Sequence, residues 1–132
     1  VRYWVGLFDG DPSGSNTPNL NFAGFRYAST ADSTWIAYVG NGSARSQGDT
    51  TIPVLPNQTY YLRVRLWTNQ VRCVIGLPGV NDGLVDGTWT VTFDGSANIP
   101  NASTLLAPYV RVTTLTNAAK SIAFGFFNAL SR

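Results

Sequence analysis

Two apolar strands joined by a short polar turn run through the middle of the chain: Thr59-Tyr-Tyr-Leu-Arg-Val-Arg-Leu-Trp67, then Thr68-Asn69-Gln70, then Val71-Arg-Cys-Val-Ile75. Successive side chains of a β-strand point to opposite faces, and the first segment alternates accordingly. Both segments are rich in β-branched and aromatic residues, which favour strands over helices. The stretch therefore predicts an antiparallel hairpin with one buried face.

The two faces of this hairpin differ in chemistry. One face of the first strand is almost entirely apolar and is expected to belong to the core: Tyr60, Leu62, Val64 and Leu66. The other face has two arginines between two aromatic residues, and strand pairing would bring a third arginine close: Tyr61, Arg63, Arg65, Trp67 and Arg72.

Three interpretations of this arginine and aromatic face stay open. Aromatic rings stack on sugars and arginine binds carboxylates in a bidentate manner, so the face can be a ligand site. Tyr, Trp and Arg are also enriched in subunit interfaces. The third interpretation is a solvated outer face, with arginine stems lying along the aromatic rings.

The rest of the chain repeats the short alternation, interrupted by Gly, Pro, Asn and Asp, with no sustained helical spacing. This pattern predicts one all-β domain over residues 1–132, a two-sheet antiparallel jelly-roll sandwich. The expected strands are Arg2–Phe8, Leu20–Tyr27, Thr34–Val39, Thr50–Leu55, Thr59–Trp67, Val71–Leu77, Thr88–Phe93, Leu105–Leu115 and Ser121–Ala129.

A second alternating stretch near the C-terminus resembles the hairpin in its chemistry. Val110 and Val112 alternate there with Tyr109, Arg111 and Thr113. Tyr109 and Arg111 therefore join the candidate ligand-binding or interface residues.

The composition narrows the function classes. Hydrophobic residues make up 44% of the chain and charged residues 12%, which indicates a folded protein. The net charge of +2 gives no strong attraction to nucleic acid. No run approaches the ~20 apolar residues of a membrane span, so no membrane insertion is expected.

The absence of two residue types argues against catalysis. The chain has no His and no Glu, which excludes a His-based triad. A glycoside hydrolase would have to use two of the seven Asp, yet most of these lie in Gly- or Ser-flanked turns. The sequence predicts a protein that is not an enzyme and holds no cofactor, with a secreted hydrolase as the least favoured alternative.

Cys73 is the single cysteine, so no internal disulfide can form. It lies in an apolar run, and no histidine exists to activate it. We expect a small buried hydrophobic side chain.

A calcium-like pattern occurs in the first loop. Asp9, Asp11 and Ser13 alternate before a glycine, as in the opening of a calcium-binding loop. The twelfth position is Leu20 instead of the bidentate Glu. A polar loop without metal is expected, with Asp9, Asp11 and Ser13 as the only calcium candidates.

A set of segments in a fixed order resembles the lectin-like (concanavalin A-like) jelly-roll domains of phage tail fibre and tail spike proteins. These segments are Val5–Asp9, Phe25–Tyr27, Trp35, Tyr60–Arg65, Asn98–Pro100, Leu106–Val112 and Ile122–Phe127. The resemblance spans nearly the whole chain and implies the C-terminal part of a longer virion fibre. It also implies a homotrimer, an extracellular or virion location, exposure to host-surface glycans and no catalytic residue.

Two functions follow as expectations. The first is a non-enzymatic tail fibre or adhesin domain that is trimeric and recognises a host-surface glycan. The alternative is a purely structural virion module, such as a trimeric capsid-decoration or fibre-capping protein. The surroundings of the arginine and aromatic face would separate the two.

Overall fold

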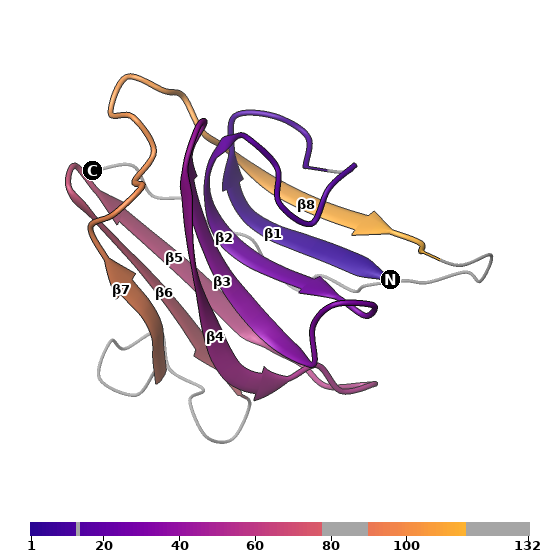
Figure 1. Cartoon of the computed structure of the whole chain (residues 1–132). Coiled ribbons are helices and arrows are strands. Elements are labelled where there is room, and N and C mark those ends of the chain that lie inside the picture. Colours follow the sequence, from indigo (N-terminus) through magenta and orange to yellow (C-terminus); the bar gives the residue numbers. More distant parts are fainter. Residues whose placement is uncertain (13, 78–89, 116–132) are drawn as a thin grey trace.

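The chain forms two packed antiparallel β-sheets (Figure 1). A computed structural model describes residues 1–12, 14–77 and 90–115. A five-stranded sheet has the order β4-β3-β2-β1-β8, and a three-stranded sheet has the order β5-β6-β7. The predicted all-β, two-sheet antiparallel sandwich is confirmed. The strands are β1 (Arg2–Phe8), β2 (Asn21–Ala28), β3 (Thr34–Asn41), β4 (Arg45–Pro53), β5 (Tyr61–Trp67), β6 (Gln70–Gly76), β7 (Thr90–Gly95) and β8 (Ala107–Thr113).

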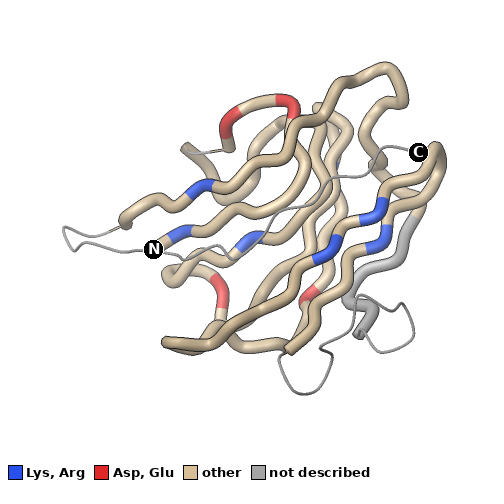
Figure 2. The backbone as a smooth tube through the Cα atoms, turned by 180° about the vertical axis from the view of Figure 1, so that it is seen from behind, with Lys and Arg blue, Asp and Glu red and all other residues tan. Residues whose placement is uncertain are grey.

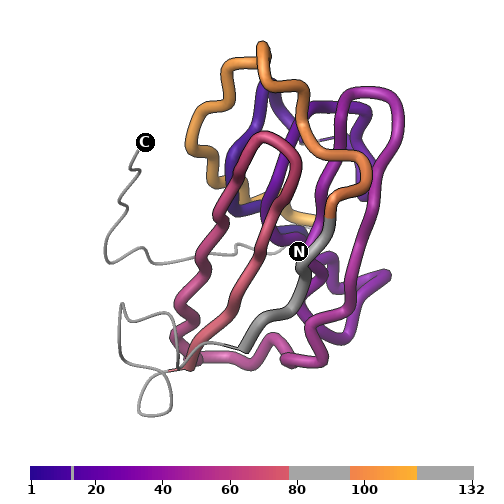
Figure 3. The backbone as a smooth tube through the Cα atoms, turned by 90° about the vertical axis from the view of Figure 1, so that its left-hand side faces the viewer, coloured from indigo at the N-terminus to yellow at the C-terminus, as the bar shows by residue number. Residues whose placement is uncertain are grey.

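Some neighbouring strands in the sheets follow each other in the sequence, whereas others are far apart along the chain. Strands β1 to β4 follow one another as a meander, and the chain then crosses to the second sheet for β5, β6 and β7. Strand β8 returns to the first sheet and pairs with β1 along its full length. The side view in Figure 3 shows the β5–β6 hairpin as a layer of its own beside the strands of the larger sheet.

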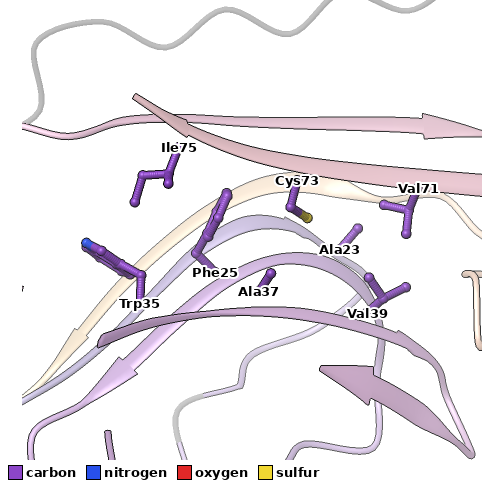
Figure 4. Close-up of a cluster of buried hydrophobic side chains, with 8 residues drawn as sticks. All are labelled: Ala23, Phe25, Trp35, Ala37, Val39, Val71, Cys73 and Ile75. Atoms are coloured by element: carbon purple, nitrogen blue, oxygen red, sulfur yellow. The ribbon is translucent and has the colours of Figure 1, made fainter. Parts of the chain in front are cut away.

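The main core lies between the two sheets, where β2 packs over β5 and β6. It is built from the inward-facing side chains of β2, β3 and β6 (Figure 4), which are at most 2% exposed: Ala23, Phe25, Trp35, Ala37, Val39, Val71, Cys73 and Ile75. Leu62, Val64 and Leu66 of β5 pack against it, as the alternation predicted. Burial of this apolar surface is the main force that holds the sheets together.

A second buried cluster occupies the outer face of the five-stranded sheet. Trp4, Phe8, Phe22 and Tyr38 are at most 2% exposed although they point away from the other sheet. The Trp4 ring meets each of the other three rings edge-on, with centroids 5.7 to 5.8 Å apart. Such edge-to-face pairs add about 0.5–1.5 kcal/mol each beyond their burial.

The connection between β1 and β2, of which residues 9–12 and 14–20 are described, crosses this outer face (Figure 1). Pro12 at its centre is fully buried. Arg26 of β2 donates from its Nη1 atom to the backbone oxygen of Asn16, and Arg2 of β1 donates from Nε to the Asn16 side-chain oxygen at 2.6 Å. The loop is thus fixed over the sheet, and it acts as a third layer above the aromatic cluster.

A buried ion pair stands beside the aromatic cluster. Arg26 and Asp32 are 7% and 5% exposed in their side chains, and they pair in a bidentate manner with Nε 2.9 Å from Oδ2. The same guanidinium donates to the Tyr38 hydroxyl at 3.1 Å, and Asp32 also accepts the Ala28 backbone N–H at 2.7 Å. The pair therefore ties β2 to β3 and to the turn that joins them.

Two glycines face each other across β1 and β2. Gly6 and Gly24 are register partners in the two strands. A Cβ atom added to Gly24 would lie 2.4 Å from the backbone oxygen of Val5 and 2.9 Å from the Gly6 Cα. Only glycine allows the backbones to approach this closely.

Strand β4 begins at Arg45, five residues before the predicted start at Thr50. The prediction missed these residues because the first half of the strand is a polar edge segment without apolar alternation. Pairing with β3 shifts register between Thr34 and Ile36, and Thr51 lies there with φ of +58°. Asp49 accepts the Thr34 hydroxyl at 2.6 Å and the Thr51 N–H at 2.7 Å. The hydrogen bond from Thr34 lowers the pKa of the Asp49 carboxyl most, and the hydrogen bond from the Thr51 N–H lowers it further.

The bounds of the other described strands match the prediction within two residues. Strand β1 has the predicted bounds, and β3 continues two residues further, to Asn41. Strand β5 begins at Tyr61 and β6 at Gln70, so the hairpin turn is the residue pair Thr68–Asn69. The predicted last strand, residues 121–129, lies outside the described residues.

Candidate functional site

The arginine and aromatic face predicted from the hairpin lies on the outer side of the three-stranded sheet. Tyr61, Arg63, Arg65 and Trp67 alternate with the core-facing residues of β5. Arg72 of β6 is the direct register partner of Arg65. Seen from behind, the arginines of the β5–β6 hairpin lie side by side (Figure 2). These five residues are called the hairpin face below.

The register puts like charges next to each other on the hairpin face. Arg65 stands opposite Arg72, and Arg72 stands opposite Asp94 of β7. Like charges placed directly opposite destabilise a sheet, whereas an anion beside them offsets the repulsion. Arg63, Arg65 and Arg72 bring three positive charges together on this face. The face is therefore suited to an anionic group.

The aromatic residues mark the two ends of the hairpin face. Tyr61 is 38% exposed and Trp67 is 44% exposed, while the three arginines between them are half-buried. Val74 lies between the arginines on the same face of β6 and is only 5% exposed. Half-buried arginines around an apolar centre lose little conformational freedom when a ligand or a subunit docks.

Tyr109 and Arg111 belong to a different surface. They project from the outer face of β8, in the sheet on the opposite side of the sandwich from the hairpin face. Tyr109 packs on Phe8 with ring centroids 5.8 Å apart, and Arg111 lies 3.6 Å from Asp11 of the first loop. The seven residues singled out from the sequence therefore form two separate surfaces.

The hydroxyl of Tyr109 has a shifted pKa. Partial desolvation raises this pKa, and the hydrogen bond to Asp11 raises it further. Tyr109 consequently stays protonated at neutral pH and can donate to the carboxylate or to a ligand.

The loop with the calcium-like pattern uses its carboxylates within the chain. Asp9 accepts the backbone N–H of Asn21 at 3.1 Å and its side-chain amide at 2.8 Å, while Asp11 lies beside Arg111. Ser13 lies outside the described residues. Within the part of the chain that the structure describes, no group of three His, Cys, Asp or Glu side chains could hold a metal ion.

Cys73 is fully buried in the main core, as predicted. Burial raises the pKa of its thiol to about 12, so the thiolate is negligible at neutral pH. Its sulfur lies 3.9 Å from the backbone oxygen of Gly24. The side chain is a packing residue and offers no nucleophile.

The sequence did not indicate three residues that lie near the surface around Tyr109 and Arg111. Trp4 is fully buried on the outer face of β1, and Arg26 with Asp32 forms the buried ion pair beside it. The apolar character of β2 on both of its faces was the available signal, because alternating burial leaves one face polar. Nothing local in the sequence pairs Arg26 with Asp32.

No protein-family model, no curated protein and no solved structure matches this chain. No helix in the described ranges is long and apolar enough to cross a membrane.

Proposed function

We propose that this chain is a non-catalytic recognition domain that binds an acidic host-surface glycan through the hairpin face. The proposal includes assembly as a homotrimer on a virion fibre, outside the cell. The observation that carries it is the row of three arginines between Tyr61 and Trp67 on one exposed sheet face.

The chemistry of the hairpin face supports a sugar ligand. Arginine presents a planar fork of donors that matches a carboxylate or a pair of sugar hydroxyls. Tyr61 and Trp67 present exposed ring surface at the ends of the row, which suits stacking on the apolar faces of sugar rings. The three arginines of the hairpin face favour uronic or sialic acids over neutral sugars, because a guanidinium pairs with a carboxylate.

The tail-fibre part of the proposal rests on other observations. The ordered segments from Val5–Asp9 to Ile122–Phe127 resemble phage tail fibre and tail spike domains, which are usually trimeric. The absence of His and Glu supports a role without catalysis. Low overall charge is compatible with close packing of identical subunits around a symmetry axis.

The test is binding to an array of neutral and acidic glycans, with the assembled protein as the probe. Acidic glycans are expected to bind above the neutral ones, and Arg65→Gln is expected to weaken binding about tenfold or more, because it removes a charge-assisted contact. Arg45→Gln is the matched control, since Arg45 is an exposed arginine of β4 in the other sheet.

Two results would overturn the proposal. One is the absence of binding to any glycan by protein whose assembly has been verified. The other is equal loss of binding in Arg65→Gln and Arg45→Gln, which would show that only net charge matters.

A structural virion module is the second candidate, favoured by the exposed Tyr61 and Trp67 rings. Exposed aromatics with arginines also make subunit interfaces. In that case Trp67→Ser would convert the oligomer to monomers in multi-angle light scattering. If the variant keeps the native oligomer and loses glycan binding, recognition is the function of this face.

A further inference from the structure

The hairpin face is arranged in four rows, each formed by one residue of β5 and its register partner on β6. From the turn outward the rows are Trp67 with Gln70, Arg65 with Arg72, Arg63 with Val74 and Tyr61 with Gly76. The pairing of β5 with β6 runs through the whole hairpin without a shift of register. The rows therefore follow one another at even steps along the strands.

Strand geometry sets the dimensions of these rows. Residues two apart on a strand are about 7 Å apart, so the face extends about 20 Å from Trp67 to Tyr61. Side chains directly opposite each other start only about 5 Å apart. A single sugar unit is several times shorter than the face, so it can occupy one row but cannot reach both ends.

The charge of the hairpin face is confined to its two middle rows. Arg65 and Arg72 share one row, and Arg63 lies in the next row opposite the uncharged Val74. The end rows contain one aromatic side chain each, together with an uncharged partner. Figure 2 shows the arginines of the hairpin next to one another in the middle of its strands.

The middle rows carry a local cost to stability. Like charges directly opposite each other destabilise a sheet, and Arg65 faces Arg72 in this way. Natural proteins accept such local conflicts mainly at functional sites. A ligand that brings negative charge to both middle rows would offset the repulsion. We therefore expect at least two anionic groups in the ligand, carried by neighbouring units.

The end rows offer exposed ring surface. Tyr61 and Trp67 are two of the four large hydrophobic side chains that are exposed in the described part of the chain. Gly76, the register partner of Tyr61, contributes no side chain beside that ring. Aromatic rings of this kind stack on the apolar faces of sugar rings. Each end of the face therefore suits one sugar unit held by stacking.

We propose that the hairpin face binds a linear acidic oligosaccharide of about four to five units, which lies along β5 and spans the face from Trp67 to Tyr61. Neighbouring acidic units pair with the arginines of the middle rows, and the end units stack on the two aromatic rings. The inference rests on the proposed function, which requires only an acidic glycan. It selects a polyuronate, with a carboxylate on every unit, over a glycan with one terminal acidic sugar.

The test is isothermal titration calorimetry of the assembled protein with oligogalacturonates of increasing length, from galacturonate to hexagalacturonate. Neutral cello-oligosaccharides of the same lengths are the matched ligands. The affinity for oligogalacturonates is expected to rise with length up to about four to five units and then to level off, because longer chains extend past the aromatic ends. The neutral chains are expected to bind far more weakly at every length.

Variants at the two ends locate the chain on the face. Tyr61→Ala and Trp67→Ala are each expected to weaken binding of pentagalacturonate about three- to tenfold, because a stacking contact is lost. Both are expected to leave binding of digalacturonate, which needs only the arginine rows, almost unchanged. Leu105→Ala is the control, since it removes an exposed apolar side chain outside the hairpin face. It is expected to change neither affinity.

Three results would overturn the proposal of an extended chain. They are equal affinities for galacturonate and pentagalacturonate, an unchanged dependence on length in Tyr61→Ala and Trp67→Ala, and equally tight binding of poly-L-glutamate, which has the charges without the sugar rings. Tight binding of a single acidic sugar that is lost in Arg65→Gln would refute the extended chain and leave the proposed function in place. Failure of every acidic glycan to bind would refute both.

Discussion

At the scale of single residues, Arg26 and Asp32 have the largest expected effect on stability. Both side chains are more than nine-tenths buried, and the pair is bidentate. Removing one member of a buried ion pair leaves the other as an uncompensated charge, which is far more costly than losing an exposed pair. The ion pair between Asp11 and Arg111, with side chains 46% and 42% exposed, provides the contrast.

We expect Asp32→Asn to lower the free energy of unfolding by about 3–5 kcal/mol, because Arg26 would remain buried without its counter-ion. The same chemical change at the exposed Asp11 is expected to cost only about 0–1 kcal/mol. Chemical denaturation of the two variants checks this. Equal effects at the two positions would show that the buried pair has no special role.

The burial of Cys73 makes the stability of the fold depend on pH in the alkaline range. The thiol has an ordinary pKa of about 9, raised by burial to about 12 in the folded chain. The unfolded chain ionises first, so this contribution to stability is complete below about pH 9 and is lost as the pH rises to about 12. The decline is expected to be shallower in Cys73→Ala, and a thiol reagent at neutral pH is expected to react only with unfolded protein. Fast labelling of the native protein would contradict the assignment.

At the scale of elements, the contact between β1 and β2 depends on Gly6 and Gly24. The two glycines let the strands approach on the face where the aromatic cluster lies. Gly24→Ala would place a methyl group 2.4 Å from the Val5 backbone oxygen, so a strand must move.

We expect Gly24→Ala to destabilise the fold by at least ~1–3 kcal/mol, the usual cost of overpacking. Gly14→Ala is the control, because a Cβ atom there meets nothing within 4 Å. Thermal unfolding of both variants gives the comparison. Equal stabilities would mean that the two strands can separate at no cost.

The bulge of β4 stores strain at Thr51, a β-branched residue with φ of +58°. Left-handed backbone costs an L-residue about 1–2 kcal/mol, whereas glycine adopts it freely. Thr51→Gly is therefore expected to raise stability by up to ~1 kcal/mol after the entropic loss is included. A lower melting temperature for this variant would show that the Thr51 side chain contributes more than the strain removes.

At the scale of the whole molecule, the five-stranded sheet is covered on both faces. The β5–β6–β7 sheet covers one face and the first loop covers the other. The hairpin face and the surface around Tyr109 and Arg111 consequently lie on opposite sides of the molecule, with the core between them.

Two surfaces separated in this way are expected to behave independently. In a double-mutant cycle the stability effects of Arg65→Gln and Arg111→Gln should add within about 0.5 kcal/mol. Unfolding free energies of the two single variants and the double variant test this. A larger coupling would show that the two faces communicate through the core.

The sequence predicted the local part of this arrangement and missed the part that depends on distant pairing. Alternation located β1 and the core face of β5, and the apolar setting of Cys73 indicated its burial. Alternation cannot show that a loop covers the outer face, so the burial of Trp4 was missed. Strand β8 pairs with β1, so Arg111 lies in a different sheet from Arg65. No local sequence pattern indicates that β8 pairs with β1.

The covering loop has a consequence for how this domain can change in evolution. Connecting segments are usually where related proteins tolerate insertions and deletions. Residues 9–20 lack that freedom, because shortening them would uncover four aromatic rings and the buried arginine. Length variation is expected instead near Ala102–Leu105, where Leu105 is 92% exposed. New specificities are thus more readily added at that end of the molecule than beside the first strand.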